Sequence, residues 1–325
     1  MKSVVIRAGV VGGAGYTGGE TTRLLLQHPS VDLIFVQSRS QQGKLLTSVH
    51  KDLVGDTNLT FSDSIDPTVD VLFLCLSHGE SKAFLTQNQV SPATKIIDLG
   101  NDFRLGDNVG GREFVYGLPE FQRDAIIEAK NIANPGCFAT TIQLGLLPLA
   151  KAKLLTTVHT TGITGSTGAG QKLQETTHFT WRTSNISAYK TLQHQHIGEI
   201  HRTLRSLQQD FGAVHFVPWR GDFARGIFVT SVLNSSKSLS ELNTLYKAYY
   251  RDHAFTHVSD EMVDIKQVVN TNKCLIYLEK VDNMLAIHSV TDNLIKGGGG
   301  QAVQNMNLMC GLDETTGLKL KGSVY

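Results

Sequence analysis

Cys137 follows a Pro135-Gly136 turn and precedes an apolar stretch, Thr140–Lys151, that predicts a helix. Pro135 fixes its own φ angle and Gly136 permits a sharp reversal, so the chain can enter the helix with the sulfur beside backbone N–H groups. Those donors and the positive end of the helix dipole favour the thiolate, which is the nucleophilic form of cysteine. A small buried cysteine without chemical function suits the turn equally well. The turn therefore predicts a candidate nucleophile that other residues must support.

Imidazole and carboxylate groups are concentrated in the segment 194–202, which opens a predicted helix. A metal-dependent hydrolase could use His196, Glu199 and His201 as ligands, although their spacing matches no common zinc motif. Alternatively, one histidine exchanges protons with a substrate held on Cys137, while Glu199, one helical turn from His196, orients or charges the ring. We favour proton transfer over metal binding and expect no metal.

A glycine-rich turn separates a predicted buried strand, Val4–Val11, from a predicted helix, Glu20–Gln27. The G-x-x-G-x-x-G spacing allows the backbone to approach a pyrophosphate at the N-terminus of the helix. A second predicted strand, Val31–Gln37, follows the helix, and this order favours dinucleotide binding over a purely structural turn. The residues of the turn that we expect at the cofactor are Gly12, Gly15, Tyr16, Thr17 and Gly18.

The residues after the second predicted strand indicate which dinucleotide is bound. A site that prefers NAD usually has an acidic residue there, which binds the ribose hydroxyls. This chain has Ser38 and Arg39 instead. Because a hydroxyl and a guanidinium suit a 2′-phosphate, we predict NADP(H) as the cofactor. The alternative is an arginine that is only solvated at the surface.

Two further segments predict strands whose carboxyl ends border the cofactor crevice. Val69–Leu76 is almost continuously apolar, as expected for a strand that is covered on both faces of a parallel sheet. It ends at Ser77, which we expect near the nicotinamide. Lys95–Leu99 leads to Arg104 at the same edge, which makes Arg104 a candidate for binding an anionic substrate.

The composition is that of an ordinary globular protein with enough apolar content for two domains. The 325 residues are 41% hydrophobic, and 30 basic against 29 acidic residues leave a formal charge of +1, so nothing favours nucleic acid or a membrane surface. No apolar run approaches the roughly 18 residues of a membrane-spanning helix. The four cysteines are far apart and lack metal-type spacing, which predicts reduced thiols in the cytoplasm.

The pattern of the sequence changes near Gly136, from alternating strands and helices to longer strands with separated helices. The change predicts an α/β protein with two domains. Residues 1–136 and 301–325 are expected to form a Rossmann-type, doubly wound dinucleotide-binding domain, and residues 137–300 an α+β catalytic and dimerisation domain. The segment 300–312 carries an apolar stripe at helical spacing, so we expect it to pack on the first domain.

The second domain contains six segments with the character of strands. They are Leu155–Thr161, Val214–Pro218, Gly226–Leu233, Val263–Asn270, Cys274–Val281 and Met284–Thr291. The Gly-, Ser- and Thr-rich segment 162–180 predicts a loop, and Leu239–Arg251 predicts a helix because its apolar residues fall on one face.

Motifs spread over the whole chain carry a resemblance to one enzyme family. They are the glycine turn with Tyr16-Thr17, the segment 134–140 around Cys137, Tyr189-Lys190 with His194, His196 and Glu199, the segment 224–227, and Lys296-Gly297 leading to 300–307. Through them the chain resembles N-acetyl-gamma-glutamyl-phosphate reductases, NADPH-dependent enzymes of arginine biosynthesis that are related to aspartate-semialdehyde and glyceraldehyde-3-phosphate dehydrogenases. Thr141, Gly198 and the segment 218–223 depart from the family pattern, which leaves the acyl group of the substrate open.

The resemblance implies a glyceraldehyde-3-phosphate dehydrogenase-like fold, a reaction and a role for each motif. Cys137 is the expected nucleophile and His194 or His196 the acid/base. NADPH reduces an N-acyl-gamma-glutamyl phosphate, through a cysteine thioester, to N-acyl-glutamate 5-semialdehyde and phosphate. The further site residues expected are Asn305 at the cofactor, and Arg104, Asn134, Arg220 and Arg225 at the substrate. A homodimer or homotetramer is expected, and a non-catalytic NADP-binding sensor is the alternative to an enzyme.

Overall fold

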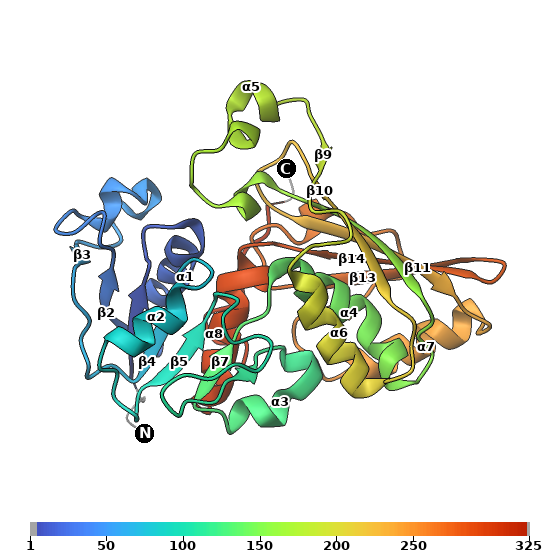
Figure 1. Ribbon diagram of the computed structural model, residues 1–325, viewed down its shortest axis with the longest axis horizontal. Helices are drawn as coiled ribbons and strands as arrows, with labels where there is room; N and C mark the ends of the chain where they lie inside the picture. The colour runs from blue at the N-terminus through green and yellow to red at the C-terminus, as the bar shows by residue number, and fades with distance from the viewer. Residues whose placement is uncertain (1–4, 324–325) are drawn as a thin grey trace. The chain divides into compact units, whose positions relative to one another are not determined.

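A computed structural model describes residues 5–323 of the chain and divides them into two compact units (Figure 1). The first unit contains residues 5–135 and 298–319, and the second contains residues 136–297 and 320–323. The sequence placed the whole of 301–325 in the first domain, and this is wrong for 320–323. There the N–H of Ser323 donates to the carbonyl of Val269, and the side chain of Asn270 donates to the Ser323 hydroxyl.

The first unit is built on a parallel seven-stranded sheet with the order β3-β2-β1-β4-β5-β7-β6. Its strands are β1 (Ile6–Val11), β2 (Val31–Gln37), β3 (Phe61–Ser62), β4 (Val71–Leu74), β5 (Lys95–Asp98), β6 (Val115–Tyr116) and β7 (Asn131–Ala133). All pairings in this sheet are parallel, as the continuously apolar central strands predict. The strand order reverses between β1 and β4, which is where doubly wound sheets bind their ligands.

The helices of the first unit are α1 (Tyr16–Leu26), α2 (Glu80–Gln87), α3 (Pro119–Ile127) and α8 (Gly300–Met309). α1 begins at Tyr16, inside the glycine turn, rather than at Glu20. α8 packs against α1, α3 and β5, the placement that its apolar stripe predicts. All of its residues are buried, so α8 is an interior helix rather than an amphipathic surface helix.

The second unit is built on a mixed seven-stranded sheet with the order β12-β13-β14-β11-β8-β10-β9. Its strands are β8 (Val158–Thr164), β9 (Ser187–Ala188), β10 (Val214–Arg220), β11 (Ile227–Asn234), β12 (Thr256–Val258), β13 (Cys274–Val281) and β14 (Met284–Thr291). β8 pairs with β10 and β12 with β13 in parallel, and the other pairings are antiparallel. The bounds of β13 and β14 are those that the sequence predicts, because both strands alternate clearly between buried and less buried residues.

The helices of the second unit are α4 (Cys137–Lys151), α5 (Phe179–Arg182), α6 (His196–Leu207) and α7 (Leu239–Tyr250). α4 packs against β11 and β14 and also contacts α6 and α7, which makes it the central helix of this unit (Figure 1). Although α4 is strongly apolar, no helix within residues 5–323 combines the length and the hydropathy that a membrane span requires.

The expected strand Val263–Asn270 is not a strand. The segment contains a 3-10 turn, Ile265–Gln267, whose N-terminus is capped by the side chain of Asp264. Val268 is buried against Val290 of β14, so the apolar residues of the segment reach the core without strand pairing. The edge strand of the sheet is β12, which pairs with β13.

The expected loop 162–180 begins later than predicted. β8 continues to Thr164, which pairs with Ile227 of β11 and Arg220 of β10. The rest of the segment contains only short helical turns at 166–169, 175–177 and the start of α5. Strand pairing on both sides of β8 therefore overrides the turn-forming composition of residues 162–164.

The carboxyl group of Asp98, at the end of β5, is fully buried in the first unit. Its Oδ1 accepts hydrogen bonds from the Ser81 hydroxyl at 2.6 Å and the Gly100 N–H at 3.1 Å, whereas no residue between 5 and 323 hydrogen-bonds its Oδ2. Burial raises the pKa of Asp98 to about 6, although these two bonds and the charge of Arg104 oppose the shift. The folded state therefore binds a proton at Asp98 more tightly than the unfolded chain does.

We predict that Asp98→Asn stabilises the protein above pH 6. The amide keeps an oxygen that accepts from Ser81 and Gly100, but it carries no charge to bury. Because the folded-state pKa is raised, the carboxylate costs stability above pH 6, and this cost disappears as the pH falls toward the ordinary value of 3.8. Urea unfolding should show a gain of up to roughly 3 kcal/mol at pH 8 and little gain at pH 4. An equal effect at both pH values would contradict this account.

Candidate active site

Cys137 is the first residue of α4, at the position that the Pro-Gly turn predicts. Gly136 is the N-cap residue with an extended backbone, and the N–H of Thr140 donates to the Gly136 carbonyl at 2.8 Å to close the first turn. The N–H groups of Phe138 and Ala139 precede this bond, so they have no carbonyl partner within the helix. This helix start can stabilise negative charge on the sulfur.

Gly136 lies directly against the imidazole of His196, the first residue of α6. A Cβ atom on Gly136 would lie 2.3 Å from His196 Nε2, so a larger residue would displace the ring. Glu199, one turn along α6, bridges the two residues: its Oε2 accepts from the Gly136 N–H at 3.1 Å, and its Oε1 lies 3.8 Å from His196 Nε2. The side chains of His196 and Glu199 are both buried, so water screens the interaction between them poorly. The arrangement supports the hypothesis that Glu199 orients His196 beside the Cys137 turn.

His194 is also buried and packs beside the residue that follows Cys137. Its Nδ1 accepts the His196 N–H at 3.2 Å, which places the ring proton of the neutral imidazole on Nε2. The ring makes edge contacts with Phe138, Tyr189 and His196 at centroid distances of 5.8, 5.7 and 4.5 Å. Because both histidines surround the start of α4, either could exchange a proton there.

Tyr189 belongs to the same cluster, although sequence reasoning assigned it no role. The guanidinium carbon of Arg220 lies 4.7 Å from the centre of the Tyr189 ring, a cation–π contact. Burial is the main cause that raises the pKa of Tyr189, and the charge of nearby Cys137 raises it further. The hydroxyl therefore stays protonated, and Arg220 lies in the cluster that contains Cys137. The only sequence signal was the place of Tyr189 in the motif that precedes His194.

Arg225 is held by a buried carboxylate that sequence reasoning also missed. Its Nε and Nη2 donate to Oδ2 and Oδ1 of Asp292 at 3.0 and 3.1 Å, a bidentate pair. The strand register explains the meeting, because Ile227 of β11 pairs with Thr291 of β14 and the two charged residues stand just beyond these ends. The Arg225 side chain is 21% exposed, so part of it reaches solvent while Asp292 does not.

Three of the expected site residues form a buried network in the first unit instead. Arg104 donates from Nε to the Asn134 carbonyl at 2.8 Å and from Nη2 to the Leu99 carbonyl at 3.0 Å. The Asn134 side chain accepts from Asn305 Nδ2 at 3.1 Å, and the same Nδ2 donates to the Gly117 carbonyl at 2.9 Å. Arg104, Asn134 and Asn305 are 5%, 1% and 0% exposed. These contacts give the three side chains a packing role within the first unit.

The glycine turn of the first unit has the geometry of a phosphate-binding loop. Gly12 has a φ of +80°, and a Cβ atom there would lie 2.4 Å from the Cys75 carbonyl oxygen. A Cβ atom on Gly18 would lie 2.4 Å from the Gly12 carbonyl oxygen. Gly15 is less crowded and precedes α1, whose first residue is Tyr16 and whose first turn has no side-chain cap. Compact backbone at an uncapped helix start suits a dinucleotide pyrophosphate.

The other cofactor candidates lie at the carboxyl ends of strands that neighbour β1. Ser38 and Arg39 follow β2; the Ser38 N–H donates to the Ser62 carbonyl at 3.0 Å, and the Arg39 side chain is exposed. Ser77 is exposed after β4, where its N–H donates to Glu80 Oε2 at 3.1 Å. Because β2, β1 and β4 are adjacent, these residues lie along the sheet edge that carries the glycine turn.

The structure does not support a metal site in the segment 194–202, all of whose residues it describes. Among the residues that the structure describes, no group of three or more His, Cys, Asp or Glu side chains could hold a metal ion. His201 instead accepts the Val214 N–H on its Nε2 at 3.0 Å, which uses this ring in packing α6 against β10.

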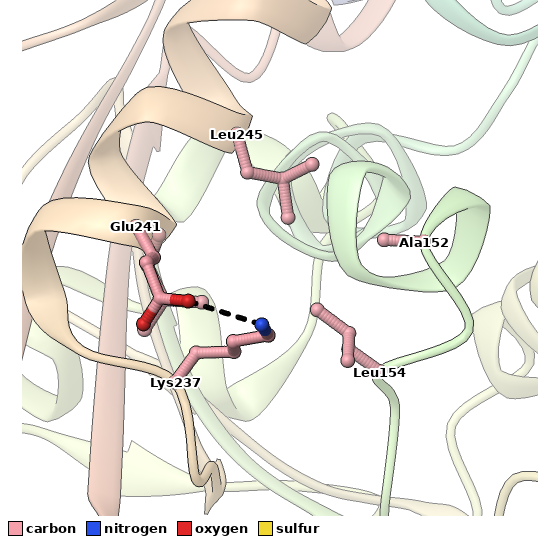
Figure 2. A pocket seen from close by; sticks show the side chains of 6 residues that line it. Ala152, Leu154, Lys237, Glu241 and Leu245 are labelled. Atoms are coloured by element: carbon pink, nitrogen blue, oxygen red, sulfur yellow. Dashed lines mark hydrogen bonds and ion pairs between the residues drawn. The ribbon is translucent and has the colours of Figure 1, made fainter.

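A separate pocket of about 300 Å³ lies at the other end of α4 from Cys137 (Figure 2). It is lined by Ala152, Leu154, Lys237, Glu241, Leu242 and Leu245. Lys237 and Glu241 form an ion pair at 3.0 Å, and Glu241 also completes the N-terminal cap of α7. These contacts account for the charged groups, and neither a thiol nor an imidazole lines the pocket, so we do not consider it a reactive site.

We predict that Gly136→Ala destabilises the protein by about 1–3 kcal/mol and displaces His196. The Gly136 backbone (φ −70°) suits alanine, so the cost comes from the overlap between the methyl group and the imidazole. Gly168→Ala is a matched control, because its Cβ atom would lie 3.4 Å from the nearest atom, Thr164 Oγ1. Urea unfolding and the imidazole NMR signals measure both effects. If the two variants are equally stable, the close packing at Gly136 is not the constraint described here.

Two family models match the chain. "Semialdehyde dehydrogenase, NAD binding domain" matches residues 7–129, and "Semialdehyde dehydrogenase, dimerisation domain" matches residues 137–293. The chain is 53% identical over 323 residues to the N-acetyl-gamma-glutamyl-phosphate reductase of Christiangramia forsetii, and 51% identical over 324 residues to that of Bacteroides thetaiotaomicron. Each alignment covers 99% of this chain and 100% of the relative.

Solved structures of the same fold are more distant in sequence. Aspartate semialdehyde dehydrogenase II from Vibrio cholerae superposes with a TM-score of 0.73 at 15% identity, covering 94% of this chain and 98% of that one. Aspartate semialdehyde dehydrogenase with NADP from Candida albicans superposes with a TM-score of 0.69 at 13% identity and the same coverage. At these identities the comparison shows the fold alone.

Proposed function

Because the chain belongs to the family of N-acetyl-gamma-glutamyl-phosphate reductases, we propose that it reduces an N-acyl-gamma-glutamyl phosphate to N-acyl-glutamate 5-semialdehyde and inorganic phosphate in arginine biosynthesis. The observation that carries this proposal is the bridge that Glu199 forms between His196 and Gly136, the residue before Cys137. A carboxylate and two imidazoles buried beside a thiol at a helix start are an arrangement typical of nucleophilic catalysis.

In the first half of the reaction, the Cys137 thiolate attacks the acyl carbon of the substrate. A carbon–sulfur bond forms, the bond from carbon to the phosphate oxygen breaks, and phosphate leaves with the electron pair. The N–H groups at the start of α4 stabilise both the thiolate and the oxyanion that forms during the attack. The product is a thioester on Cys137, whose carbonyl accepts hydride more readily than a carboxylate does.

The second half of the reaction requires a hydride and a proton. NADPH supplies the hydride when it is bound. His194 or His196 donates the proton to the alkoxide, which gives a thiohemiacetal. When this intermediate collapses, the same histidine takes the proton back, the carbon–sulfur bond breaks with its electron pair on sulfur, and the aldehyde leaves a Cys137 thiolate. Glu199 holds the His196 ring in place and compensates the positive charge that the ring carries when protonated.

Among the arginines predicted to bind the substrate, Arg220 has the strongest support. Its guanidinium lies over the ring of Tyr189, which belongs to the cluster around Cys137. A guanidinium pairs well with phosphate or carboxylate oxygens. Arg225 remains a candidate through its solvent-exposed part. Arg104 loses support because it donates to two backbone carbonyls of its own unit.

We propose NADP(H) rather than NAD(H) as the cofactor, because Ser38 and Arg39 stand at the sheet edge where an NAD-preferring site has a carboxylate. Gly12, Gly15 and Gly18 would receive the pyrophosphate together with the first residues of α1. Ser77, after β4, is the candidate nearest the nicotinamide by its place on the sheet.

Arg39→Asp tests the cofactor proposal. It places a negative charge beside the expected 2′-phosphate, so NADPH binding should weaken by roughly 10-fold or more while NADH binding changes little. Arg39→Gln, which removes the charge without reversing it, should have a smaller effect in the same direction. Fluorescence titration with both cofactors measures the difference. Equal losses for NADPH and NADH would refute the pairing.

The second unit also supports the proposal that the protein is a homo-oligomer. It matches a dimerisation domain, and half-buried apolar residues of its sheet alternate with the fully buried core residues. Phe228, Val232, Leu275 and Tyr277 are four of these half-buried residues, and all but Val232 also pack against the cluster of Val263, Val268 and Val290 in the same unit. A second copy covering this face would give a homodimer, and two such dimers a homotetramer.

We also propose that the protein lies in the cytoplasm. The four cysteines, all within residues 5–323, form no disulfide, as expected of a reducing compartment.

Cys137→Ser and histidine variants separate the nucleophile from the acid/base. Cys137→Ser should abolish the release of phosphate from N-acetyl- or N-succinyl-glutamyl phosphate, because a hydroxyl does not ionise near neutral pH. His194→Asn or His196→Asn, whichever changes the proton donor, should still release a burst of phosphate without NADPH. The same variant should lower the full reaction by roughly 100-fold to 10,000-fold.

Two controls make this experiment decisive. NADPH binding should be unchanged in all three variants, which excludes global unfolding. Burial raises the pKa of the Cys75 thiol to about 12, so Cys75 should not be alkylated under conditions that modify Cys137. If Cys137→Ser reduces either acyl phosphate at a rate near that of the wild type, the thioester mechanism is wrong.

A further inference from the structure

Asp292 is a fully buried carboxylate that the thioester mechanism does not use. Oδ1 accepts from the N–H groups of Leu294 and Ile295 at 2.8 and 3.0 Å and from Arg225 at 3.1 Å. Oδ2 accepts from the Asn270 N–H at 2.8 Å and from Arg225 at 3.0 Å. Two of these five donors belong to Arg225 and the other three are backbone N–H groups. The carboxylate therefore organises the surrounding backbone as well as the guanidinium.

The backbone of Asp292 connects the same residue to Cys137. Its carbonyl accepts the Gly297 N–H at 2.8 Å, which closes a turn over residues 292–297. A Cβ atom on Gly297 would lie 2.7 Å from Cys137 Cβ and 3.1 Å from Cys137 Cα. The turn that Asp292 begins therefore ends against the backbone of the proposed nucleophile. The Asp292 carboxylate caps this turn through Leu294 and Ile295, in the way that aspartate caps a helix.

The next residue, Asn293, fixes the other end of the arrangement. Its side-chain oxygen accepts the Gly226 N–H at 2.8 Å, directly after Arg225. Its Nδ2 donates to the Thr167 hydroxyl at 2.9 Å, and that hydroxyl donates to the Ala224 carbonyl. Asp292 and Asn293 together therefore hold both the guanidinium of Arg225 and the main chain that carries it.

We propose that Asp292 is a positioning residue that fixes the Arg225 guanidinium for the substrate anion and, through the 292–297 turn, the Gly297 backbone behind Cys137. The first role rests on the proposed function, since it needs an anionic substrate. The second role concerns the thiol alone and can be measured without turnover. Two substitutions separate the roles, because an amide can cap the turn but cannot neutralise a guanidinium.

Asp292→Asn should affect the substrate and leave the thiol unchanged. Its oxygen still accepts from Leu294 and Ile295, so the rate at which limiting iodoacetamide alkylates Cys137 should stay within about 2-fold of the wild type. Loss of the ion pair frees the Arg225 guanidinium to move. The KM for the acyl phosphate should therefore rise roughly 10-fold, with a smaller change in kcat.

Asp292→Ala removes the cap and the charge together. The KM should rise as in Asp292→Asn, and the alkylation rate of Cys137 should also fall by at least about 3-fold because the turn packed on the helix start loosens. Asp260→Asn is the matched control: Asp260 pairs with Lys247 at the surface, and neither measurement should change. Mass spectrometry reads the alkylation of Cys137 against Cys310 in the same sample, and NADP titration checks that each variant is folded.

A double variant keeps the proposal open to refutation even if Asp292→Ala fails to fold. If Asp292 acts on the substrate through Arg225, adding Asp292→Asn to Arg225→Met should raise KM no further than Arg225→Met alone does. Additive increases would overturn this role, as would an unchanged KM in Asp292→Asn. A wild-type alkylation rate in folded Asp292→Ala would overturn the second role. If the wild type turns over neither acyl phosphate, the proposed function fails, while the alkylation comparison still decides the role of Asp292 at the thiol.

Discussion

The cluster around Cys137 depends on the absence of a side chain at Gly136. The missing Cβ allows the His196 ring to lie against the backbone one residue before the thiol, and it leaves the Gly136 N–H open to Glu199. A methyl group would move α6 away from the start of α4, and with it the ring and the carboxylate. The apolar packing of α4 against β11, β14 and α6 holds the helix start in this contact. Close backbone approach thus links the core of the second unit to its chemistry.

Buried carboxylates serve this unit in a common way. Glu199 joins a backbone N–H to a histidine, and Asp292 joins three backbone N–H groups to an arginine. In each case the cost of burying a negative charge is offset by donors that the fold has already fixed. Asp98 of the first unit differs from them, because burial raises its pKa to about 6 although its Oδ1 accepts hydrogen bonds from Ser81 and Gly100.

The resemblance of motifs spread over the whole chain identified the family. The sequence by itself also determined the fold class and the identity of the proposed nucleophile. These depend on local signals: the Pro-Gly turn before an apolar helix, glycines at the end of a buried strand, and alternation along β13 and β14. Short-range backbone preferences and burial patterns are enough to produce them. The same reasoning failed for Val263–Asn270, where apolar residues reach the core from a capped turn rather than from a strand.

Only the tertiary structure decided which polar residues meet. Arg104, expected at the substrate, and Asn305, expected at the cofactor, are both buried and hydrogen-bonded within the first unit. The sequence gives no local sign of which residues Tyr189 and Asp292 contact, because their partners Arg220 and Arg225 lie far away in the chain and meet them through strand pairing. The His196 ring likewise lies against Gly136 only because α4 and α6 pack together. Spacing along a chain reports on one element at a time, whereas burial and hydrogen bonding depend on how distant elements are brought into contact.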